Sequence, residues 1–104
     1  MAQVGDMIYL HDRVTRVSSK PVMRWCMVVA RNGSMARVCP RSTTKVGPVF
    51  TTVGYMPEFD QAGWFSRYDR PVAAHVVDQA RNIGPLPEPA RGDVLALYLP
   101  GAQP

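Results

Sequence analysis

The sequence predicts a mainly β protein, a small barrel or sandwich of five to seven strands with short helical turns. Short runs of β-branched and aromatic residues follow one another at close spacing, and Gly, Pro or Asn separates them. The chain has 104 residues, the length of one domain with a single modest core. We therefore expect one domain over residues 1–104.

Three strands are expected before residue 42. Asp6–Leu10 is a short apolar run, and the polar residues 11–21 after it form a loop long enough to suggest a function. Val22–Arg31 and Ser34–Arg41 form a hairpin, because Asn32-Gly33 between them is the favoured pair for a two-residue type I′ turn.

The second half of the chain continues in the same style. Val49–Tyr55, Trp64–Tyr68 and Val72–Val77 are predicted as strands. Asp78–Gly84 is expected to make a short turn of helix, and Asp93–Leu99 is either a strand or a short helix.

The expected turn fixes a register for the hairpin. If Arg31 pairs with Ser34, Arg24 faces Arg41 on one side of the sheet. The other side is then apolar and forms the core, with Trp25, Met27, Val29, Ala36 and Val38. Because like charges directly opposite are destabilising, the arginine pair indicates either an anionic partner or two side chains that splay into solvent.

The net charge of +4 is unevenly distributed. Between His11 and Lys45 one acid, Asp12, stands among eight basic residues: Arg13, Arg16, Lys20, Arg24, Arg31, Arg37, Arg41 and Lys45. Such clustering favours an anionic partner, and the planar fork of Arg fits phosphate. A GC-rich genome explains the abundance of Arg equally well.

The cysteines and histidines give no strong motif. The same register makes Cys26 and Cys39 cross-strand neighbours, so a disulfide is geometrically possible, although two buried inert thiols fit a cytoplasmic chain better. His75 is expected as a buried histidine in an apolar strand, and His11 either touches a ligand or faces solvent. No four of these residues have the spacing of a zinc site.

Other signals are mostly negative. The chain has no triad-hydrolase, Walker, Rossmann or His-Glu-x-x-His motif, no secretory leader and no apolar run long enough to span a bilayer. We therefore expect a cytoplasmic protein. Three aromatics flank two arginines and either stack nucleic-acid bases or lie in the core: Trp64, Phe65 and Tyr68, with Arg67 and Arg70.

Four segments follow one another in the order of a known family. They are Gly5-Asp-Met-Ile-Tyr9, Val22-Met-Arg24-Trp-Cys-Met-Val-Val29, Val38-Cys-Pro-Arg-Ser-Thr43 and Val76-Val-Asp-Gln-Ala-Arg-Asn-Ile83. They resemble the opening Gly-Asp-Val strand, the Arg-Pro-x-Leu-Val-Val strand, the Val-x-Pro-Ile-Thr-Ser segment and the Leu-x-x-x-Gln-Ile-Arg-Thr-Ile segment of the MazF/PemK toxin family. Loop 11–21 takes the place of the family's variable loop over the active site.

The resemblance implies a small SH3-like β-barrel of the CcdB/PemK type and a homodimer. It also implies an endoribonuclease that cuts single-stranded RNA without metal or cofactor. The ribose 2′-OH attacks the adjacent phosphate and leaves a 2′,3′-cyclic phosphate and a 5′-OH. Arg24 falls on the family's catalytic arginine and Ser42 on its catalytic threonine, while Trp25 stands where the family usually has Pro.

Arg24 is expected to stabilise charge on the phosphate, and Ser42 to donate a hydrogen bond to it. The remaining residues expected to bind substrate are Arg13, Arg16, Lys20, Arg41, Thr43, Gln79 and Arg81. The partners implied are single-stranded RNA and an acidic antitoxin. The alternatives are a CcdB-like gyrase poison on the same fold and a non-catalytic module that binds nucleic acid or protein.

Overall fold

The computed structural model describes residues 1–43, 50–54, 56–59, 63–66 and 69–97. Within these residues the chain forms the strands β1 (Asp6–His11), β2 (Met23–Asn32), β3 (Met35–Ser42), β4 (Phe50–Gly54), β5 (Gly63–Ser66), β6 (Arg70–Ala73) and β7 (Arg81–Pro85), and the helices α1 (Asp12–Thr15), α2 (Ala74–Gln79) and α3 (Ala90–Ala96). The prediction of a mainly β chain with short helical turns is therefore confirmed.

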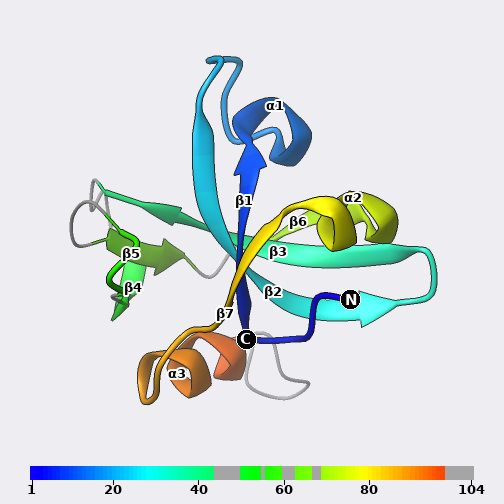
Figure 1. The fold of residues 1–104 in the computed structure, drawn as a ribbon. Coiled ribbons are helices and arrows are strands. Elements are labelled where there is room, and N and C mark those ends of the chain that lie inside the picture. The colour runs from blue at the N-terminus through cyan, green and yellow to red at the C-terminus, as the bar shows by residue number, and fades with distance from the viewer. Residues whose placement is uncertain (44–49, 55, 60–62, 67–68, 98–104) are drawn as a thin grey trace.

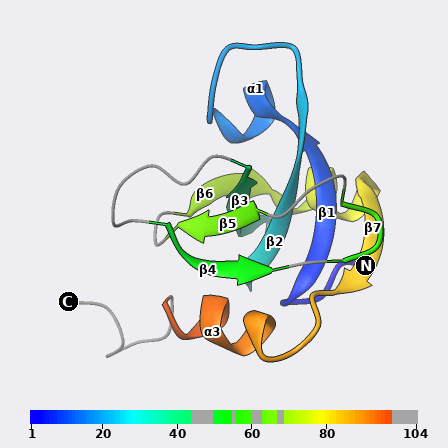
Figure 2. The ribbon, with the colours of Figure 1, turned by 90° about the vertical axis from the view of Figure 1, so that its left-hand side faces the viewer.

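The strands form one antiparallel sheet in the order β4-β5-β3-β2-β1-β7, with β6 also paired to β3 (Figures 1 and 2). The first half of β3 pairs with β6 and its last two residues pair with β5, so β3 lies at the branch of the sheet. Among the described strands no pairing joins β4 to β7.

The sheet carries apolar clusters on both faces. The first core comprises Ala2, Ile8, Leu10, Cys26, Val28, Ala36, Val38, Val72 and Val77. The second core comprises Met7, Met27, Val29, Cys39, Met56, Phe59, Phe65, Leu86 and Val94. Strand β2 alternates between the two, so neither face of the hairpin is open as a whole.

The first five predicted strands occur at the expected places, and the predicted loop 11–21 begins with the helix α1. The ring nitrogen Nδ1 of His11 accepts a hydrogen bond from the backbone N–H of Arg13 at 3.1 Å and caps this helix. His11 is half-buried in this role. A polar stretch read as loop therefore contains one turn of helix with its own cap.

The predictions for residues 74–84 are wrong. The strand ends at Ala73, residues Ala74–Gln79 form α2, and β7 replaces the expected helical turn. Ala74 and Val77 are both buried, and a spacing of three residues belongs to a helix face and not to a strand. His75 is consequently exposed on α2 and is not a core histidine. The last apolar element is a helix, α3, one of its two predicted forms.

The turn of the main hairpin lies one residue later than predicted. Asn32 pairs with Met35, so the two-residue loop is Gly33-Ser34. Gly33 has a φ of 63°, and a glycine with positive φ at the first loop position is typical of a type II′ turn. The predicted pairing of Arg31 with Ser34 is wrong, because Arg31 pairs with Ala36.

A β-bulge between Val28 and Ala30 then changes which side chains share a face. The shifted turn moves the register by two residues, which preserves the faces, whereas the bulge moves it by one, which reverses them. Ala36 and Val38 therefore lie in the first core, away from Met27 and Val29 in the second. The predicted single apolar face is wrong.

The cysteines follow the same change. Cys26 pairs with Pro40 and Met27 with Cys39, so the thiols point into different cores and are not cross-strand neighbours. Both are buried and neither forms a disulfide, which agrees with the reading of two buried thiols. Burial raises the pKa of the Cys26 thiol, which keeps it protonated and unreactive.

Candidate functional site

Arg24 at the start of β2 forms a two-pronged ion pair with Asp12 of α1. Its Nε donates to Oδ1 of Asp12 at 2.8 Å, and its Nη2 donates to Oδ2 at 3.0 Å. The side chain of Asp12 is fully buried, whereas that of Arg24 is 25% exposed. This bidentate geometry fixes the plane of the guanidinium as well as its position.

Asp12 ties the segment after β1 to β2. Its Oδ2 also accepts a hydrogen bond from the hydroxyl of Ser18 at 2.8 Å, and its backbone N–H donates to the carbonyl of Val22 at 2.9 Å. The hydrogen bond from Arg24 holds the pKa of the Asp12 carboxyl below its usual value, although burial opposes this. Asp12 is therefore a carboxylate that orients Arg24.

Arg24 keeps part of its hydrogen-bonding capacity. Its Nη1 donates to the backbone carbonyl of Arg41 at 3.0 Å, which is the third hydrogen bond of the guanidinium to the described residues. A guanidinium has five N–H groups, so one on Nη1 and one on Nη2 remain for a ligand. Each of these groups can donate to an oxygen of a phosphate.

Ser42, and not the side chain of Arg41, shares a face with Arg24. Cys26 pairs with Pro40, and alternation from this register puts Arg24 and Ser42 on one side of the sheet and Arg41 on the other. The predicted juxtaposition of two arginine side chains is therefore wrong, and the β-bulge is its physical cause.

Arg41 is instead buried on the side of the second core. Its Cζ lies 4.1 Å from the centre of the Phe59 ring, a cation–π contact. A Cβ on Gly63 would lie 2.5 Å from Cζ and Nε of Arg41, so the absence of a side chain at this glycine makes room for the guanidinium.

The residues expected to follow the RNA backbone lie near α1. Arg13, Arg16 and Lys20 are exposed and form no ion pair with the described residues. Arg13 donates from Nε to the carbonyl of Ser19 at 3.2 Å. Thr43 is exposed just beyond β3. The structure therefore leaves three cations of the predicted loop facing solvent.

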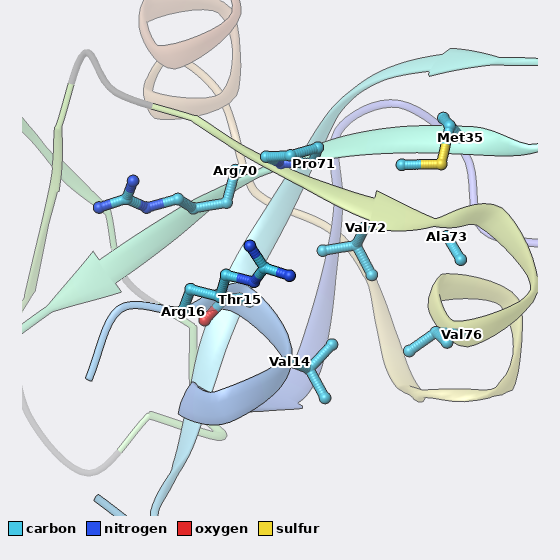
Figure 3. A pocket seen from close by; sticks show the side chains of 9 residues that line it. All are labelled: Val14, Thr15, Arg16, Met35, Arg70, Pro71, Val72, Ala73 and Val76. Carbon is cyan, nitrogen blue, oxygen red and sulfur yellow. The ribbon is translucent and has the colours of Figure 1, made fainter. Parts of the chain in front are cut away.

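A groove of about 440 Å³ lies between α1, β6 and α2 (Figure 3). Its lining is mostly apolar, with Val14, Val72 and Val76 from these three elements, and Arg16 and Arg70 add two positive charges. The groove is open to solvent and contains none of the predicted catalytic residues.

Gln79 and Arg81 stand on either side of the junction between α2 and β7. Gln79 is exposed at the end of the helix. Arg81 places its Cζ 5.4 Å from the centre of the Trp25 ring, which in turn lies 4.5 Å from the ring of Tyr9. Sequence reasoning missed Tyr9 and Trp25 as members of a site, although a tryptophan in the family's proline position was a signal.

Acids from the second half of the chain neutralise part of the basic cluster. Arg31 pairs with Asp78 at 2.7 Å between Nη1 and Oδ1, and Arg37 pairs with Asp69. The guanidinium of Arg31 lowers the pKa of Asp78 to about 2. These pairs connect the hairpin to α2 and to the residue before β6. Two of the clustered arginines are therefore paired with acids within the fold. Lys45 lies outside the described residues.

The second arginine-aromatic segment contributes one aromatic residue to the core. Phe65 is fully buried in the second core and Trp64 is half-buried beside it on β5. Arg70 is exposed, and Arg67 and Tyr68 lie outside the described residues. The core reading is therefore confirmed for Phe65, whereas Trp64 belongs to neither core and lies directly opposite Ser42.

In the described part of the chain no three His, Cys, Asp or Glu residues come together as a metal site. None of its helices is long and apolar enough to cross a bilayer. No protein-family model, curated protein or solved structure matches the sequence or the fold.

Proposed function

We propose that this protein is a toxin-type endoribonuclease that cuts single-stranded RNA without metal, on a small SH3-like barrel of the MazF/PemK type. One observation carries the proposal. Arg24 is held by a buried carboxylate, keeps two N–H groups for a ligand and shares a face of the sheet with Ser42.

The positions of the resembling segments support the proposal. They fall on β1, on β2, on the end of β3 and on the junction of α2 with β7. Two of these segments supply Arg24 and Ser42 from neighbouring strands, and the segment that replaces the family's variable loop supplies Asp12 beside them.

The chemistry asks little of the protein, because RNA supplies its own nucleophile. The 2′-OH attacks the adjacent phosphorus and loses its proton to solvent, and the 5′-oxygen leaves and takes up a proton. The two N–H groups of Arg24 stabilise the negative charge that grows on the phosphate oxygens, and the Ser42 hydroxyl donates to one of them. Since free Arg has a pKa above 12, Arg24 acts through its charge and not as a base.

Asp12 is a positioning residue in this scheme. Its side chain is fully buried and therefore does not reach the substrate. It keeps the guanidinium in one orientation before RNA binds, which lowers the cost of reorganisation in the transition state. The exposed Arg13, Arg16 and Lys20 bind flanking phosphates, so binding weakens steeply as salt is raised.

The test is cleavage of a long single-stranded RNA in EDTA, with the ends mapped chemically. We expect discrete cuts with 5′-OH and 2′,3′-cyclic phosphate ends. Arg24→Ala should slow cleavage by on the order of 100-fold or more. The matched control is Arg37→Ala, which removes an arginine paired to an acid elsewhere on the hairpin and should leave the rate unchanged. Intact RNA, or equal cutting by Arg24→Ala, would contradict the proposal.

One observation favours a second candidate, a module that binds nucleic acid without cutting it. Asp12 compensates the charge of Arg24, which weakens the field of the pair at a phosphate. This candidate predicts retarded but intact RNA in the same assay. Intact RNA without retardation would indicate a protein partner such as gyrase. The homodimer, the acidic antitoxin and the cytoplasmic location stay predictions.

A further inference from the structure

Three side chains form a row across the strands β7, β1 and β2. Tyr9 is directly opposite Trp25 on one side and directly opposite Arg81 on the other, with β1 between the two neighbouring strands (Figure 1). Directly opposite residues point to the same face of a sheet, so the three side chains lie next to one another. We name Tyr9, Trp25 and Arg81 the stacking row.

The two rings of the stacking row pack against each other, and the guanidinium of Arg81 lies over the Trp25 ring. The ring centres of Tyr9 and Trp25 are 4.5 Å apart with planes tilted by 36°, and Cζ of Arg81 lies 5.4 Å from the Trp25 centre. The two rings are half-buried and Arg81 is exposed. Within the described residues no acid pairs with Arg81, so its exposed guanidinium keeps its charge at the edge of the row, beside the exposed part of the two rings.

The core beneath holds the stacking row in place. Trp25 packs on Phe59 at 5.9 Å between ring centres, and the guanidinium of Arg41 lies over the Phe59 ring. Phe59 belongs to the second core. The row is therefore supported by packed side chains and loses little conformational freedom when a ligand binds.

An unpaired nucleobase is the ligand that suits these groups. Bases stack on aromatic rings and on guanidinium planes, largely without regard to sequence, and an arginine also attracts the phosphate next to the base. We propose that the stacking row binds a base of single-stranded RNA. The inference rests on the proposed function for the choice of RNA as ligand.

The stacking row holds a nucleotide away from the scissile phosphate. Trp25 follows Arg24 in β2, so their side chains point to opposite faces of the sheet. The row therefore contributes to the affinity and register of the RNA and not to the chemical step.

Tryptophan fluorescence can test the proposal directly. The chain has two tryptophans, so Trp64→Phe leaves Trp25 as the only one. We expect oligoadenylate, titrated at low salt in EDTA, to quench Trp25 with saturation. In this background Arg81→Lys, which keeps the charge and loses the plane, should weaken binding by about tenfold. Arg70→Ala removes an exposed arginine outside the row and should weaken it by less than about twofold.

No quenching, or equal effects of Arg81→Lys and Arg70→Ala, would overturn the stacking row. If Trp64→Phe does not fold, ultraviolet cross-linking of a 5-bromouridine RNA to the unchanged protein gives the same decision. Adducts on Tyr9 or Trp25 support the proposal. If all adducts lie on other residues, the proposal is overturned.

The proposed function fails separately. In the wild type, quenching of Trp25 without any cleavage supports the stacking row and contradicts the nuclease. Cleavage without quenching does the reverse.

Discussion

Each face of the sheet has one arginine beside the first residues of β2. Arg24 lies in β2 itself, Arg81 lies in β7, and the two are held in different ways. Arg24 is bound by the buried carboxylate of Asp12, whereas Arg81 lies over the ring of Trp25 and pairs with no acid in the described part of the chain. A carboxylate fixes the position of the guanidinium but neutralises its charge. An aromatic ring supports the guanidinium and leaves its charge uncompensated. The first arrangement suits precise placement at a reacting group, and the second suits affinity for a polyanion.

The largest expected effect is the loss of stability on removal of the carboxylate that holds Arg24. Asp12→Ala leaves Arg24 and Ser18 without their carboxylate, and we expect a loss of roughly 2–3 kcal/mol in the free energy of unfolding by urea. This lies below the cost for a fully buried pair because Arg24 is a quarter exposed. Asp78→Ala breaks a pair whose carboxylate is partly exposed, whereas that of Asp12 is buried, and serves as control with a smaller loss. Equal losses would show that Asp12 is no better anchored than a surface acid.

Acid should remove the contribution of Asp12 to stability, and comparison with Asp12→Asn separates it from that of other paired acids such as Asp78. The pKa of Asp12 in the folded protein lies below its ordinary 3.8, so its contribution to stability is complete above that pH and is lost as the pH falls through the folded value. We expect the unfolding free energy of the wild type to drop faster below about pH 4 than that of Asp12→Asn, which has no carboxylate to protonate. Parallel curves for the two proteins, measured by denaturation at each pH, would contradict the assignment.

A smaller effect is expected on the aromatic side. Gly63→Ala places a Cβ against the guanidinium of Arg41, which must then leave Phe59 or displace β5. Such overpacking costs roughly 1–3 kcal/mol. In the control Gly92→Ala, the new Cβ meets the flexible end of the Glu88 side chain, so thermal unfolding should change little. A stable Gly63→Ala would mean that Arg41 is not held in place there.

Much of the fold could be predicted from local patterns, and the register could not. Alternation and turn residues located β1 to β5, because those signals are local. The β-bulge after Val28 leaves no mark in the sequence, yet it exchanges the faces of everything beyond it. The helix α2 could not be predicted for a different reason. Its valines favour strands, and only the burial of Ala74 and Val77 reveals the helical spacing.

The candidate site was predicted in part. The sequence singled out Arg24 and Ser42, and the register puts both on one face. It could not show that Asp12 would bind Arg24, because that contact depends on how α1 folds back over the strand. Alternation assigns Trp25 to the core, and its half-buried ring does pack against the second core, but alternation could not show that the ring also carries Arg81.

The most direct test of this division between the faces is single-turnover cleavage of RNA at increasing protein concentration. We predict that Arg24→Ala lowers the plateau rate by on the order of 100-fold and leaves the half-saturating concentration unchanged. Arg81→Lys should raise the half-saturating concentration by about tenfold and leave the plateau unchanged. A full plateau rate for Arg24→Ala, or the same parameter altered in both variants, would contradict the account.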